Sequence, residues 1–170
     1  MALPSKKYGG RPYALWGDVK MVVDPWDCSS SHELIHLLAP VRKTAFSEGL
    51  AQGLQREGNE IMKEQNVNLN TKKYLQDGSF TNLDTIIQNG TAGSMNYYHQ
   101  MGSFVYYNIY IMDKDKQFGE FLQALEDDSL AEVKRKYEDI MERDFDTVVE
   151  DWKEWVKGID KNSDIYVKWK

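Results

Sequence analysis

The sequence predicts a mainly helical domain with a small β component, that is, a fold of the α+β class. Several segments carry apolar residues at helical spacing between recognisable helix caps. One short β-branched run lies near the amino-terminal end, and one segment of alternating apolar and polar residues closes the chain. With 41% hydrophobic and 28% charged residues, the composition is that of a folded globular protein.

The amino-terminal part is expected to contain one strand and two helices. Residues 1–18 are rich in Gly, Pro and Tyr and are expected to form an irregular lead-in. Residues 19–24 (VKMVVD) are β-branched and are expected to form a strand. Asp27 and the serines at 29–31 offer N-caps for a helix that continues through Leu38. A second helix is expected over residues 44–65.

The middle of the chain combines a polar segment with a long helix. Residues 67–92 are polar and turn-rich, with turns expected at Asp77-Gly78 and Asn89-Gly90. Short helical pieces are expected at 71–76 and 82–88. A long helix crowded with aromatic residues is expected over residues 94–112.

Residues 94–158, which include this long helix, are expected to form a helical carboxyl-terminal subdomain. Helices are expected at residues 114–125, 129–142 and 145–158. Ser129 and Glu132 have the spacing of a capping box at the start of the second of these. Residues 164–170 (DIYVKWK) alternate in polarity, so the 159–170 tail is expected to contain a strand.

Charge and hydropathy restrict the possible partners. The net charge of −6 and the scattered Lys and Arg residues argue against nucleic-acid binding, which needs a concentrated basic face. No apolar run approaches the roughly 20 residues that a membrane span requires. The start, MALPSKKYGG, has no apolar segment of the kind found in signal peptides.

The residues His32-Glu33-Leu34-Ile35-His36 form a His-Glu-x-x-His motif. On a helix, residues four apart share a face, so both imidazoles can reach one ion while Glu33 lies beside it. Zinc accepts neutral imidazole nitrogen readily, and a catalytic zinc site takes a third ligand from the protein. Ser30 could form a capping box with Glu33, whereas capping by Ser29 or Asp27 would leave Glu33 available as a base.

Glu48 follows His36 by twelve residues and begins the stretch Glu48-Gly49-Leu50-Ala51 on the next predicted helix. This pairing resembles the gluzincin metallopeptidases, a group of zincins in which a glutamate of a Glu-Gly-x-Ala stretch completes the zinc site. The resemblance implies one catalytic Zn²⁺ held by His32, His36 and Glu48, with Glu33 as general base. It also implies a zincin-like peptidase domain over residues 19–158.

Residues 97–107 look like the tyrosine-containing helix of the same family. The resemblance therefore implies that Tyr98 donates a hydrogen bond to the developing oxyanion, with Tyr97 and His99 as the alternatives. In the thermolysin group, an Asp four residues after the glutamate ligand holds a zinc-bound histidine; in this chain that position is Gln52.

The resemblance implies a peptide or protein substrate. Many gluzincins are exported or bound to the cell envelope, so the resemblance also favours such a location for this chain. An alternative interpretation is that the chain is a catalytically inactive binding module with a zincin fold and a structural zinc. Glu33 separates the two, because a general base has a purpose only in the enzyme.

Overall fold

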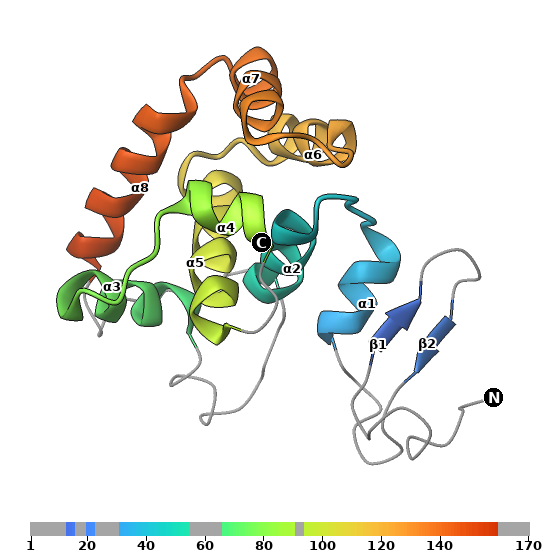
Figure 1. The fold of residues 1–170 in the computed structure, drawn as a ribbon, viewed down its shortest axis with the longest axis horizontal. Helices are drawn as coiled ribbons and strands as arrows, with labels where there is room; N and C mark the ends of the chain where they lie inside the picture. Colours follow the sequence, from blue (N-terminus) through green and yellow to red (C-terminus); the bar gives the residue numbers. More distant parts are fainter. Residues whose placement is uncertain (1–12, 16–19, 23–30, 55–65, 91–93, 160–170) are drawn as a thin grey trace.

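The computed structural model describes residues 13–15, 20–22, 31–54, 66–90 and 94–159 of the chain. The described part is mainly helical, as the sequence predicts, and Figure 1 shows its arrangement. Its α-helices are α1 (Ser31–Leu38), α2 (Thr44–Leu54), α3 (Val67–Asp77), α4 (Leu83–Asn89), α5 (Met95–Tyr106), α6 (Asp115–Ala124), α7 (Leu130–Met141) and α8 (Phe145–Gly158).

A short antiparallel hairpin lies beside α1 (Figure 1). Its strands are β1 (Tyr13–Leu15) and β2 (Lys20–Val22), with Ala14 opposite Met21. β2 falls inside the segment 19–24, whereas β1 lies in the lead-in that was expected to be irregular. The expected N-caps at 27–30, the continuation of the second helix over 55–65, and the expected strand at 164–170 lie outside the described residues.

Helix ends follow the local sequence signals closely. The side chains of Ser129 and Glu132 form the predicted capping box at the start of α7. Gly78 and Gly90 both have positive φ and end α3 and α4, at the two predicted turns. Glycine adopts this conformation without the steric cost that a Cβ atom brings.

Two helices differ from the predictions. α3 is longer than the expected 71–76 because Asn66 caps it at residue 67 and its first turns bury the polar side chains of Asn68 and Thr71. The long helix expected over 94–112 changes to a π-helix, η3 (Tyr107–Ile111), at its end. There the amide of Met112 donates to the carbonyl of Tyr107.

The hydrophobic core lies between α5 and the surrounding helices. Phe104 of α5 has its ring centroid 5.7 Å from that of Phe145 and 5.4 Å from that of Trp152, both on α8. Phe46 of α2 meets Phe121 of α6 edge to face at 5.2 Å. None of the described helices has both the length and the apolar character needed to cross a bilayer.

α2 is fixed between α1 and α5, and this position matters for the site. A Cβ atom at Gly49 would lie 3.0 Å from Cβ of Met101, and one at Gly53 would lie 2.6 Å from the carbonyl oxygen of Gly102. The two helices therefore meet almost backbone to backbone, which larger residues at these positions would prevent. At the start of α2, the Lys43 ammonium donates to the carbonyl oxygen of Asp128 at 2.6 Å.

Candidate metal centre

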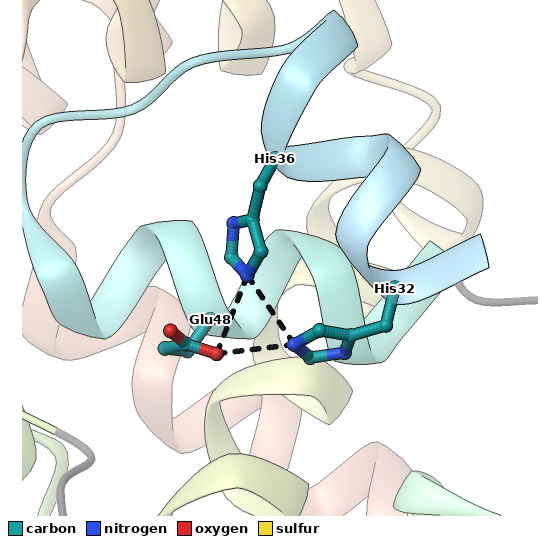
Figure 2. Close-up of side chains that lie close together, drawn as sticks. All are labelled: His32, His36 and Glu48. Carbon is teal, nitrogen blue, oxygen red and sulfur yellow. Dashed lines mark hydrogen bonds and ion pairs between the residues drawn. The ribbon is translucent and has the colours of Figure 1, made fainter. Parts of the chain in front are cut away.

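The structure brings His32, His36 and Glu48 together, and Figure 2 shows their side chains converging. The two histidines lie one helical turn apart on α1, with ring centroids 4.9 Å apart and nearly perpendicular planes. Glu48 projects from α2 toward both rings. The helical spacing of the motif thus has the geometric result that it predicts.

The three candidate donor atoms form a nearly equilateral triangle. The Oε2 atom of Glu48 is 3.2 Å from Nε2 of His32 and 3.5 Å from Nε2 of His36. The two Nε2 atoms are 3.3 Å apart. Zinc ligands at about 2.1 Å from a tetrahedral centre lie about 3.4 Å from one another. The donor set and its spacing therefore fit a zinc ion, and this group could hold one.

Solvent reaches one side of this triangle. The side chains of His32 and Glu48 are 20% and 22% exposed, whereas that of His36 is 10% exposed. A structural zinc site is usually closed by four protein ligands, while a catalytic site takes three and stays open. Among the residues that the structure describes, the triangle supplies three donors, two of them on partly exposed side chains.

The charge of the triangle also suits a cation. Burial raises the pKa of Glu48, but the hydrogen bonds and positive charge of His32 and His36 outweigh this effect and bring the pKa to about 2. Glu48 is therefore ionised at neutral pH, and it supplies the one negative charge of the donor set.

Ser47 makes the hydrogen bond that anchors His36. Its Oγ atom lies 3.0 Å from Nδ1 of His36, and both side chains are buried. The role of Ser47 is not among those predicted from the sequence. The signal was its place directly before Glu48, on the helix that faces His36, together with the need of a metal-bound imidazole for a partner at its other nitrogen.

Gln52, the position considered for this role from the sequence, is buried elsewhere. Its Cβ and Cγ atoms lie 3.2 Å from a Cβ atom built at Gly102 of α5, so it packs into the α2–α5 contact. Ser47 instead supplies the hydrogen bond that the structure gives to His36.

Glu33 lies half-buried on α1, directly after His32. The three oxyanion candidates lie on α5 and have different surroundings. Tyr97 packs against the hydrophobic core. His99 is buried, and its Nδ1 atom lies 2.8 Å from the hydroxyl of Tyr74 on α3, which faces it with a nearly parallel ring. Burial lowers the pKa of His99.

Tyr97 lies four residues before Met101 and Tyr98 four residues before Gly102, and both Met101 and Gly102 meet α2, so both tyrosines come from the part of α5 next to the ligand helix. Both tyrosines are half-buried.

Comparison of the whole chain with protein-family models, curated proteins and solved structures finds no significant match. The resemblance to the gluzincins therefore rests on short motifs. These are residues 31–36 on α1, residues 46–51 on α2, and residues 97–107 on α5 and η3.

Proposed function

We propose that this protein is a zinc-dependent metallopeptidase of the gluzincin type, with a zincin-like domain that hydrolyses peptide bonds. The observation that carries the proposal is the triangle of donor atoms at 3.2, 3.3 and 3.5 Å, formed by a His-Glu-x-x-His helix and a glutamate helix. The pairing matters more than either motif alone, because two histidines do not complete a catalytic zinc site.

His32, His36 and Glu48 would hold the metal. When bound, Zn²⁺ supplies a Lewis acid that lowers the pKa of water and polarises a carbonyl oxygen. Glu33 then has the role of general base: its carboxylate accepts a proton from the attacking water and delivers it to the leaving amine nitrogen. Because Glu33 directly follows the first ligand on α1, its carboxylate would lie beside the metal and the attacking water.

Tyr98 would donate its phenolic hydrogen to the substrate carbonyl oxygen as negative charge develops there. Removal of one such donor typically costs about 3 kcal/mol of transition-state stabilisation. The choice of Tyr98 is supported by the resemblance of residues 97–107 to the tyrosine-containing helix of the gluzincins, whereas His99 is already paired with the Tyr74 hydroxyl.

The first experiment measures zinc content and peptide cleavage on the same samples. We expect one zinc per chain after loading and desalting, and loss of that zinc in His36→Ala. Glu33→Gln should retain zinc while kcat/KM for a peptide library falls by a factor of about 100 or more. Glu120→Gln removes an exposed carboxylate of α6 and should change neither quantity.

The outcomes separate the two readings of the motif. Zinc binding without cleavage by the wild-type protein would favour the binding module with a structural zinc. Unchanged turnover in Glu33→Gln would refute the proposed mechanism. Absence of retained zinc would refute the metal site itself.

A further inference from the structure

We infer that Ser47 is a positioning residue that fixes the ring orientation and tautomer of His36, an inference that rests on the proposed function of the metal triangle. The hydroxyl of Ser47 lies 3.0 Å from Nδ1 of His36, on the opposite side of the ring from the Nε2 atom that joins the triangle. Both nitrogens of this imidazole are therefore held by protein groups.

The role of Nε2 in the triangle determines which nitrogen of His36 would carry the hydrogen. Nε2 of His36 lies 3.3 Å from Nε2 of His32 and 3.5 Å from Oε2 of Glu48. An imidazole nitrogen binds a metal ion through its lone pair, so a neutral His36 that serves as a ligand at Nε2 carries its hydrogen on Nδ1.

Ser47 is suited to accept that hydrogen. A serine hydroxyl in a helix can donate to the carbonyl four residues earlier, which leaves its oxygen lone pairs for an N–H group. Because Ser47 is only 7% exposed, water does not readily replace it as the acceptor. The Nδ1–H tautomer is the one that leaves Nε2 available to a metal ion.

The position of Ser47 joins two parts of the site in one helix. Ser47 and Glu48 are consecutive residues of α2, so the same helical turn supplies the third ligand and the support of the second. The support is also neutral. With Zn²⁺ at +2 and Glu48 at −1, the site keeps a net charge of +1, whereas a carboxylate in place of Ser47 would bring it to zero. A less neutralised zinc is the stronger Lewis acid.

The test combines zinc affinity with nitrogen NMR of the histidine rings, both at pH 7.5. In the metal-free wild-type protein, ¹⁵N chemical shifts should assign the ring hydrogen of His36 to Nδ1. In Ser47→Ala that preference should be lost, and the dissociation constant for zinc, measured by competition with a chromophoric chelator, should rise about 10- to 100-fold. Ser47→Thr keeps the hydroxyl and should restore both properties.

Ser103→Ala is the matched control. Ser103 is also buried, and its Oγ atom accepts a hydrogen bond from the indole of Trp152 at 3.1 Å, away from the metal triangle. Its loss removes a comparable hydrogen bond and should lower stability without changing the His36 tautomer or the zinc affinity. A general effect of buried serine loss would therefore appear in both variants.

The possible results test the role of Ser47 and the proposed function separately. Wild-type zinc binding with unchanged affinity and tautomer in Ser47→Ala would overturn the role of Ser47 and leave the proposed function standing. A wild-type protein that binds no zinc would refute the proposed function, while the metal-free NMR would still test Ser47. If Ser47→Ala does not fold, the ¹⁵N measurement on the metal-free wild-type protein still tests the role of Ser47. A hydrogen on Nε2 of His36 would overturn that role and leave the proposed function standing.

Discussion

Replacing Gly53 by alanine tests whether the close contact with α5 fixes the position of the ligand helix α2. The new Cβ atom would lie 2.6 Å from the carbonyl oxygen of Gly102. Carbon and oxygen atoms in contact normally stay about 3.3 Å apart, so the helices would have to separate by about 0.7 Å. The obstacle is backbone rather than a flexible side chain, so it cannot turn away.

Gly119 provides the matched substitution. It lies inside α6, and a Cβ atom there has no heavy atom within 4 Å. Both changes gain helix propensity, worth up to about 1 kcal/mol for glycine to alanine, but only the change at Gly53 introduces overpacking, which costs about 1–3 kcal/mol. The propensity gain largely cancels in the comparison, so Gly53→Ala should be about 1–3 kcal/mol less stable than Gly119→Ala.

Urea denaturation followed by circular dichroism measures both free energies of unfolding under the same conditions. Zinc affinity gives a second readout, because Glu48 lies on the displaced helix and should bind more weakly in Gly53→Ala only. Equal stability of the two alanine variants would refute the reasoning, since it would mean that α2 and α5 separate without cost.

Two further substitutions test the core and the loop before α7. Tyr137→Phe should lower the free energy of unfolding by about 1–3 kcal/mol, because it leaves the side-chain oxygen of buried Asn108 without its donor; a loss under about 0.5 kcal/mol in urea denaturation would contradict this. Asp128→Asn should cost about 1–2 kcal/mol at pH 7, because Asp128 accepts hydrogen bonds from the Glu126 amide and from Lys136. Burial raises the pKa of Asp128, but these bonds outweigh it and bring the pKa below 3.8, so the stabilisation exists above pH 3.8 and disappears as the pH falls through the lower folded-state pKa. A wild-type advantage over Asp128→Asn that stays constant in denaturation curves down to pH 2 would be inconsistent with this assignment.

The helical framework was predictable wherever local signals determine it. The capping box of Ser129 and Glu132 and the glycines at 78 and 90 mark helix ends through hydrogen bonds and backbone conformation within a few residues. The start of α3 was missed because its first buried side chains include Asn68 and Thr71. Hydrophobic periodicity does not register polar residues that a tertiary contact buries, such as Thr71 beneath the carbonyl of His99.

The π-helix at the end of α5 also takes part in a tertiary contact. The Asn108 side chain donates to the carbonyl of Phe104 and accepts from Tyr137 of α7. The bond with Tyr137 joins residues 29 positions apart, so no short window of the sequence around η3 contains it.

The candidate ligands were predictable because one helix and one short connection bring them together. His32 and His36 are placed by helical spacing, and Glu48 by a motif on the next helix. Ser47 was not recognised, since its role depends on the angle at which α1 and α2 meet. The choice among Tyr97, Tyr98 and His99 likewise depends on which side of α5 faces the triangle, and that is a tertiary property.

The local character of the triangle has a consequence for folding kinetics. The first and last of its candidate ligands, His32 and Glu48, are 16 residues apart. The contact between α2 and α5, through Gly49 and Met101, joins residues that are much farther apart in the sequence. Closing a short loop costs less entropy than closing a long one, so the α1–α2 pair can assemble before α5 docks. A refolding chain is therefore expected to capture zinc early, and zinc present from the start should accelerate stopped-flow refolding more than zinc added after collapse. Equal rates in the two orders of addition would show instead that the ligands meet only after α5 is in place.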